Sequence, residues 1–176
     1  MDDRERHVAI AAARRPRVVL LALRSLLWTV LLPGMIAGYV PWRYLGVSQV
    51  QLDFSNPLHL VALVVVAIGV ALLAACIWDF ARRGRGTLSP VDPPKELVVQ
   101  GLYRYVRNPM YVGVSLIILG EALLARRAAL VLYWAFFFTM ANLFVRFYEE
   151  PALRAQFGES YVRYTEREGR WLPRLK

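Results

Sequence analysis

The sequence predicts an all-α, polytopic membrane protein with about four transmembrane helices and a C-terminal interfacial helix. Three observations predict this class. Hydrophobic residues make up 57% of the 176 residues, the mean hydropathy is +0.39, and several apolar stretches approach the length that crosses a bilayer as a helix. The chain is short enough for one membrane domain over residues 1–176, which we therefore expect.

The predicted membrane helices are four apolar segments. They cover residues 18–40, 58–80, 109–125 and 128–147. The third segment would be roughly 25 Å long as a helix, slightly less than the hydrocarbon core, so it is expected to be short, tilted or partly interfacial. Only Arg126 and Arg127 separate the third segment from the fourth. These two segments should therefore form a tight antiparallel hairpin.

The positive charge predicts orientation and partners. The net charge of +9 is carried mainly by arginines in the N-terminal arm, in residues 82–107 and in the C-terminal tail, whereas the 41–57 loop has only Arg43. The positive-inside rule then places both termini and the middle loop in the cytoplasm, in a bacterial inner membrane or an endomembrane. The arginines are expected to meet anionic lipid headgroups rather than nucleic acid.

Two further features limit the class of protein. Cys76 is the single cysteine, which excludes an internal disulfide and a multi-cysteine metal site. The charged residues before the first apolar segment are too many for a usual signal peptide, so the N-terminus should be retained. The sequence gives no indication of the oligomeric state.

The segment GLYRYVRNPMYVG, Gly101–Gly113, leads into the third apolar segment. Asn108 is a favoured N-cap and Pro109 a favoured first helical residue, so a helix should begin here with its free N–H groups at the cytoplasmic interface. Arg104 and Arg107 add charge, and a guanidinium can bind a carboxylate through two hydrogen bonds. This pattern indicates an anion receptor. The alternative is a capped helix whose arginines contact lipid phosphates.

A pair of carboxylates follows the fourth apolar segment. Glu149 and Glu150 should lie at a helix end whose dipole disfavours them, and Pro151 predicts that a new helix begins there. Arg146 is a local candidate partner for either carboxylate. Because a short turn makes the third and fourth helices neighbours, Arg107 should approach the two glutamates. An anion receptor beside a cation receptor suits a zwitterion.

The tail predicts an amphipathic interfacial helix over this site. Its larger apolar and aromatic residues recur at spacings of four, four and three, at Leu153, Phe157, Tyr161 and Tyr164. Gly158 argues against one continuous helix. Trp171–Pro173 could anchor its end at the interface.

The GLYRYVRNPMYVG segment, the EE pair and the tail LRAQFGESYVRYTEREGRWLPR together resemble the isoprenylcysteine carboxyl methyltransferase and phospholipid methyltransferase family of integral membrane enzymes. The resemblance covers about residues 85–174 and assigns them to a cofactor-binding catalytic region. It implies S-adenosylmethionine as the cofactor without a Rossmann fold. The sequence agrees with this, since it has no GxGxxG between a strand and a helix.

The family's Arg-His-Pro-x-Tyr signature falls on residues 107–111, with asparagine in place of histidine at Asn108. The resemblance implies catalytic roles for Arg107, Tyr111, Glu149 and Glu150. It implies cofactor contacts for these four and for Tyr103, Asn108, Pro109, Gly113, Tyr161 and Tyr164, with Arg170 as a supporting residue. Asn108 forms hydrogen bonds but cannot exchange a proton near neutral pH, so a histidine base is not available at this position.

The resemblance implies methyl transfer to a lipophilic or membrane-resident acceptor, foremost carboxyl methylation of an isoprenylcysteine-like substrate. A carboxylate acceptor needs no base, whereas an amine or thiol would need a glutamate or tyrosine, because His7 and His59 lie elsewhere in the sequence. The sequence contains no cluster of histidines and cysteines, so it does not predict a metal site. The alternatives are a phospholipid or amine N-methyltransferase, an NADPH-dependent reductase of the sterol type, and a non-catalytic membrane accessory protein.

Overall fold

The computed structural model describes residues 31–83, 97 and 99–174, and its regular elements there are helical. The main helices are α2 (Val40–Tyr44), α3 (Pro57–Arg83), α4 (Pro109–Ala125), α5 (Ala128–Phe144), α6 (Glu150–Phe157) and α7 (Glu159–Arg167). Two π-helical segments, η1 (Met35–Tyr39) and η4 (Val145–Glu149), and two short 3₁₀ turns, η2 (Val47–Gln49) and η3 (Gly101–Arg104), complete them. The predicted all-α class is confirmed for this part of the chain.

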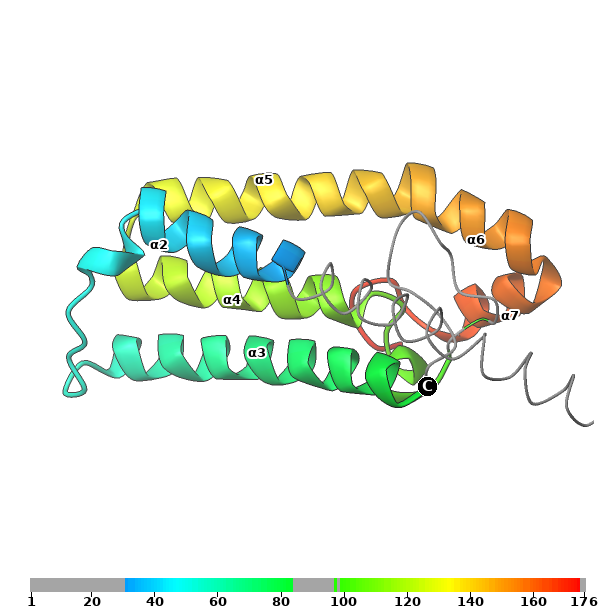
Figure 1. The fold of residues 1–176 in the computed structure, drawn as a ribbon, viewed down its shortest axis with the longest axis horizontal. Helices are drawn as coiled ribbons and strands as arrows, with labels where there is room; N and C mark the ends of the chain where they lie inside the picture. The colour runs from blue at the N-terminus through cyan, green and yellow to red at the C-terminus, as the bar shows by residue number, and fades with distance from the viewer. Residues whose placement is uncertain (1–30, 84–96, 98, 175–176) are drawn as a thin grey trace, which may run out of the picture.

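Helix α4 lies at the centre of the bundle, with α3 on one side and α5 on the other (Figure 1). Glycines allow α3 and α4 to approach closely. A Cβ atom added to Gly69 would lie 2.7 Å from the carbonyl oxygen of Gly113, and one added to Gly120 would lie 2.9 Å from that of Ala62. Small residues at such contacts are common between membrane helices, which associate through close packing.

The turn between α4 and α5 confirms the predicted tight hairpin. Arg126 ends α4 in the left-handed region, with φ of 51°, and Arg127 directly precedes α5. A left-handed residue at this position is a common way to end a helix. The two helices then return along one another, which brings the start of α4 back to the end of α5 (Figure 1).

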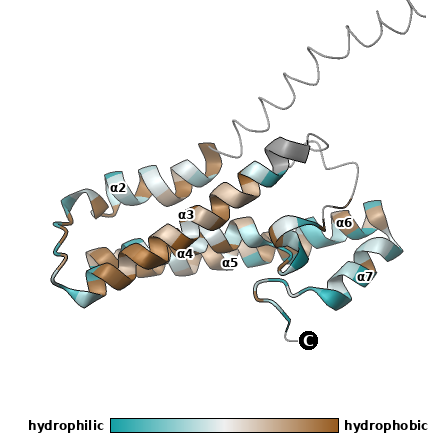
Figure 2. Ribbon diagram, turned by 90° about the horizontal axis from the view of Figure 1, so that it is seen from below, coloured by the Kyte–Doolittle hydropathy of each residue, from teal (hydrophilic) through white to brown (hydrophobic). Residues whose placement is uncertain are grey.

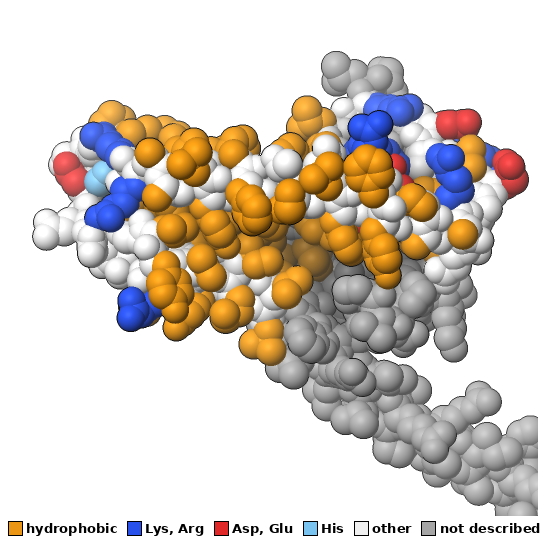
Figure 3. Space-filling view, turned by 90° about the horizontal axis from the view of Figure 1, so that it is seen from above, with side chains coloured by type: hydrophobic (Ala, Val, Ile, Leu, Met, Phe, Trp, Pro, Cys, Tyr) orange, Lys and Arg blue, Asp and Glu red, His pale blue; other side chains and the backbone are white. Residues whose placement is uncertain are grey.

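The bundle carries an apolar belt between two charged ends. Figure 3 shows hydrophobic side chains over the middle of the molecule and arginines and carboxylates towards both ends. Figure 2 shows the same change along the chain, from hydrophobic α3 and α4 to hydrophilic α6 and α7. Large side chains on α3 and α5, including Val64, Ile68, Leu132 and Phe136, are exposed. Such a belt is typical of a lipid-facing surface.

Two helices are long and apolar enough to cross a membrane, Pro57–Asp79 and Ala128–Phe157. Helix α4 is a shorter apolar helix, as the sequence predicts. The predicted first segment, 18–40, lies mostly outside the described residues, as do the basic N-terminal arm and most of the basic middle loop. The structure therefore supports membrane association through two such helices. The presence of four transmembrane helices and their orientation in the membrane stay predictions.

The prediction of a new helix beside Pro151 is confirmed, since α6 begins at Glu150 with proline in its first turn, but the prediction that the fourth helix ends near residue 147 is wrong. Helix α5 continues through η4 into α6, and the membrane-span candidate runs unbroken to Phe157. The backbone forms a π-helical turn just before Pro151. Proline has no backbone N–H, so one hydrogen bond of a regular α-helix cannot form there. Glu149 and Glu150 consequently lie within a continuous helix, so the end-of-helix dipole does not act on them. The chain turns at Gly158, with φ of 53°, and the predicted tail helix is divided there into α6 and α7.

Candidate active site

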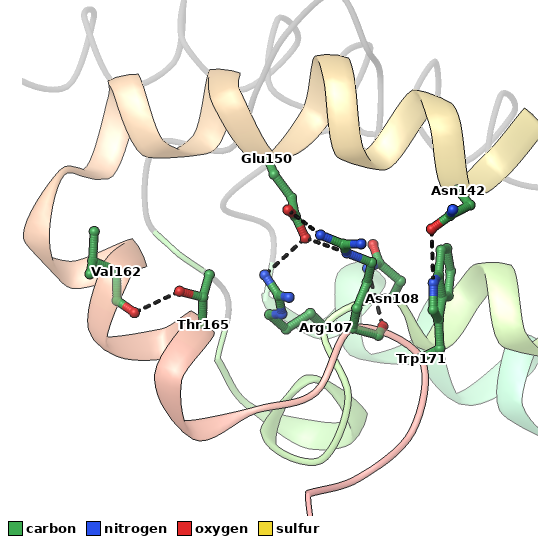
Figure 4. Close-up of polar contacts among 8 residues, drawn as sticks. Arg107, Asn108, Asn142, Glu150, Val162, Thr165 and Trp171 are labelled. Atoms are coloured by element: carbon green, nitrogen blue, oxygen red, sulfur yellow. Dashed lines mark hydrogen bonds and ion pairs between the residues drawn. The ribbon is translucent and has the colours of Figure 1, made fainter.

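The predicted polar residues meet where the start of α4, the α5–α6 helix and the C-terminal segment come together (Figure 4). The guanidinium of Arg107 lies beside the carboxylate of Glu150, with 2.9 Å between Nη1 and Oε1. Arg107 precedes α4, and Glu150 is the first residue of α6. The expected approach of Arg107 to the glutamate pair is therefore confirmed.

Glu150 is held by a second arginine. Arg170 donates from Nε to Oε1 over 2.7 Å and from Nη2 to Oε2 over 2.8 Å. The Glu150 side chain is 18% exposed, and that of Arg107 is 10% exposed. Two charge-assisted bonds in a partly desolvated site are strong interactions, and the hydrogen bond with Glu150 raises the pKa of Arg170. Glu150 is thus compensated by two cations. Arg146, the local candidate partner, does not pair with Glu150 in the structure. Its guanidinium lies over the ring of Phe147 instead.

Glu149 has a different environment from its neighbour. Tyr111 donates a long hydrogen bond from its hydroxyl to Oε2 of Glu149, over 3.4 Å. Within the described part of the chain, Glu149 makes no ion pair. Adjacent helical residues point about 100° apart, so one carboxylate faces the arginines and the other faces α4. The pair therefore consists of a compensated carboxylate and an available one.

An aromatic wall adjoins Glu149. Trp171 contacts Tyr111 edge to face at 6.2 Å between ring centroids and lies 5.2 Å from the ring of Phe138. Its indole donates to Oδ1 of Asn142 over 3.2 Å. Trp171 was expected as an interfacial anchor, but in the structure it packs against α4 and α5. This ring set shields one side of the site from water.

The C-terminal segment is fixed to the start of α4. The backbone N–H of Arg107 donates to the carbonyl of Gly169 over 2.9 Å, in an isolated parallel bridge of Val106 with Gly169. Asn108 precedes the helix and Pro109 begins it, as predicted. The predicted side-chain cap by Asn108 is wrong, because its Nδ2 donates to the carbonyl of Arg170 over 3.2 Å and makes no cap bond. Asn108 is buried, so it ties two distant segments together.

One donor of Arg107 has no partner. Its Nε is buried, and no hydrogen-bond acceptor meets it in the described structure. A buried, unsatisfied donor is costly, typically by about 1–3 kcal/mol, and is uncommon in folded proteins. The orphaned Nε therefore marks a place where an acceptor atom of a ligand would be favourable.

Three tyrosines belong to the cluster, and two of them, Tyr161 and Tyr164, lie near Arg107. The hydroxyl of Tyr164 donates to the carbonyl of Tyr103 over 2.6 Å, and Tyr161 is almost fully buried. Burial raises the pKa of all three phenols, and the charge of Arg107 opposes this rise at Tyr161 and Tyr164. These side chains are consequently neutral hydrogen-bonding groups around neutral pH rather than bases.

The structure separates other predicted residues from this cluster. Gly113 lies in the contact between α3 and α4, and Pro109 is fully buried at the start of α4, so packing accounts for both. His59 lies near the other end of α3, where Nδ1 accepts a hydrogen bond from the backbone of Asp53. The described residues contain no group of three or more metal-ligating side chains.

Sequence reasoning missed Asn142 and its contact with Trp171. An asparagine inside an otherwise apolar segment is a signal in itself, because polar groups at membrane depth need partners. Asn142 meets this need through Trp171, and the two residues connect α5 with the C-terminal segment (Figure 4).

A comparison with protein families covers part of this site. The phospholipid methyltransferase family model matches residues 57–160, more than half of the chain. The matched range begins at α3 and includes Arg107 and both glutamates, whereas Arg170 and Trp171 follow it. A comparison with curated proteins finds no match to the chain. The match over this range establishes that the protein belongs to the phospholipid methyltransferase family of membrane methyltransferases.

Proposed function

We propose that the protein transfers a methyl group from S-adenosylmethionine to a lipid-type acceptor at the membrane surface. The observation that carries this proposal is the pairing, in one cluster, of a buried donor of Arg107 and a carboxylate of Glu149 that find, among the described residues, no acceptor and no cation respectively. The methionine end of the cofactor carries both complements, a carboxylate and an ammonium group. The residues present therefore fit the group.

The charges of the cluster assign different tasks to its members. Arg107 would hold the cofactor carboxylate through its free Nε, and Glu149 would hold the ammonium group. Glu150 and Arg170 position Arg107, because both oxygens of Glu150 are already bonded to guanidiniums. When bound, the cofactor supplies a methyl group that its sulfonium already activates. The protein then has to align the acceptor and exclude water, for which the ring set of Tyr111, Phe138 and Trp171 is suited.

Two classes of methyl acceptor are considered, and they differ in whether the acceptor has to lose a proton. Carboxyl methylation of an isoprenylcysteine-like acceptor requires no proton removal, which suits a site without histidine. The amine headgroup of a phospholipid is the second candidate. It is supported by the family match and by Glu149, which lies in the cluster as a possible proton acceptor.

Calorimetry on the full-length protein in detergent would test the cofactor. We expect binding of S-adenosylmethionine and S-adenosylhomocysteine and no binding of NADPH. Binding of NADPH alone would favour the reductase alternative, and binding of neither would favour a non-catalytic accessory protein. Incubation with labelled cofactor and either a farnesylated cysteine or phosphatidylethanolamine would then separate the acceptors, because only a carboxyl methyl ester releases methanol in alkali.

A further inference from the structure

A second polar site lies between η3 and α7, in a pocket of about 450 Å³. Its lining residues are Leu97, Val99, Arg104, Ser160, Arg163, Tyr164, Arg167 and Glu168. The arginines of the cofactor cluster, Arg107 and Arg170, do not line it. The pocket therefore adjoins the cluster through Tyr164, while its arginines are different ones.

The pocket wall is positively charged. Three guanidiniums face one carboxylate, and within the described residues none of the three arginines forms an ion pair. Arg163 and Arg167 are one helical turn apart, so they lie on the same face of α7. Arg104 reaches the pocket from η3, and its guanidinium lies 5.0 Å from the ring centroid of Tyr105. All three arginines are exposed, so water and salt screen their mutual repulsion, and an anion bound in the pocket would be attracted by all of them.

Apart from the charged residues and Ser160, the pocket wall consists of Leu97, Val99 and Tyr164. Leu97 and Val99 contribute aliphatic surface, and Val99 is 41% exposed. Tyr164 is held by the hydrogen bond from its hydroxyl to the carbonyl of Tyr103. The combination of an arginine set with an adjoining apolar surface matches a ligand that has an anionic head and a lipophilic body.

We propose that this pocket binds the phosphate group of an acidic phospholipid. Guanidinium forks fit phosphate oxygens, and the excess of arginines favours a headgroup with a net negative charge. The pocket is lined by residues of η3 and α7, and α7 lies at the hydrophilic end of the bundle, beyond the apolar helices (Figure 2). Soluble phosphate compounds share this chemistry, so the experiment has to separate them from lipids. The proposal does not depend on the identity of the methyl acceptor.

The test uses the full-length protein in detergent, titrated with mixed micelles of phosphatidylglycerol or phosphatidylcholine and, separately, with inorganic phosphate. Arg163→Gln and Arg167→Gln are the pocket variants. Arg154→Gln on α6 is the matched control, because Arg154 is exposed and does not line the pocket. We expect each pocket variant to weaken phosphatidylglycerol binding about tenfold and the control to change it less than about twofold. Inorganic phosphate at the same concentration should not displace the lipid.

Three results would overturn the proposal. They are an equal loss in the pocket variants and the control, equal affinity for the two lipids, and displacement of the lipid by equimolar inorganic phosphate. Thermal unfolding checks that each variant is folded. If a glutamine variant unfolds, Arg163→Lys replaces it, since lysine keeps the charge but loses the fork. The lysine variant should retain part of the affinity, and full affinity would contradict the role of the fork.

Discussion

Arg170 binds both oxygens of Glu150 through two parallel hydrogen bonds, although the two residues are 20 positions apart. Arg107 shares the same carboxylate from a third segment. This arrangement joins α6, the residues before α4 and the C-terminal segment in one charged network. The network explains why Arg107 is held with its Nε buried, and it connects the stability of the site with its capacity to bind a ligand.

Replacing Arg170 should weaken both the fold and the site. Arg170→Ala removes the bidentate partner of a largely buried carboxylate, so we expect a loss of about 1–3 kcal/mol in the free energy of unfolding. Arg170→Lys should recover only part of it, because the fork is lost. Unfolding in detergent, with Arg154→Ala as the exposed control, measures the difference. Equal stability of Arg170→Ala and the wild type would show that the network is not structural.

The two glutamates should respond differently to the same substitution. Glu149→Gln removes an uncompensated carboxylate, so it should weaken S-adenosylmethionine binding by about 1–3 kcal/mol with little change in stability. Glu150→Gln leaves two guanidiniums without their anion and should mainly lower stability. Calorimetry together with thermal unfolding separates the effects. Unchanged affinity in a folded Glu149→Gln protein would remove Glu149 from the proposed ammonium site.

Arg107 is the proposed holder of the cofactor carboxylate. Arg107→Ala should weaken cofactor binding at least about tenfold, since a charge-assisted contact is lost, and Arg107→Lys should restore part of it. Because Glu150 retains Arg170 in both variants, the protein should stay folded. A stable Arg107→Ala protein that binds S-adenosylmethionine as the wild type does would contradict this role.

Asn108 links the start of α4 to the carbonyl of Arg170. Asn108→Leu removes the donor and leaves a partly buried carbonyl without this partner, with an expected cost of about 1–3 kcal/mol in stability. Asn108→His keeps a donor and should be closer to the wild type. Thermal unfolding of the two variants side by side measures this. Equal stability of both variants would show that the hydrogen bond between Asn108 and Arg170 does not stabilise the fold.

The buried tyrosines predict a loss of stability at alkaline pH. Burial raises the pKa of Tyr103, Tyr161 and Tyr164 above the ordinary value of 10.0. Above about pH 10 the unfolded chain releases these protons before the folded protein does, so the free energy of unfolding falls as the pH rises. At lower pH both states are protonated, and the contribution is constant. Tyr164→Phe should show a smaller decline between pH 9 and 11, as about one ionisable group is removed. An unchanged decline would exclude Tyr164 as a source.

The sequence by itself determined the helical membrane class, the start of α4 and the approach of Arg107 to the glutamate pair. Apolar length, the Asn108–Pro109 step and a hairpin closed by Arg126 and Arg127 are local properties of the chain, and local patterns are sufficient to predict them. The family resemblance added the choice of Arg107, Tyr111 and both glutamates, all of which lie within the range that the family model matches.

Only the tertiary structure decided which carboxylate is compensated and which is available. Two features of the backbone produce this difference: the π-helical η4, which joins α5 to α6 just before Pro151, and the turn at Gly158, which returns the chain to α4. The partners that result are distant in sequence, since Asn108 meets Arg170 across 62 positions and Trp171 meets Asn142 across 29. Hydropathy and cap patterns report on neighbours within a few residues. Contacts that depend on where a helix widens and where the chain turns are fixed by packing of the whole bundle.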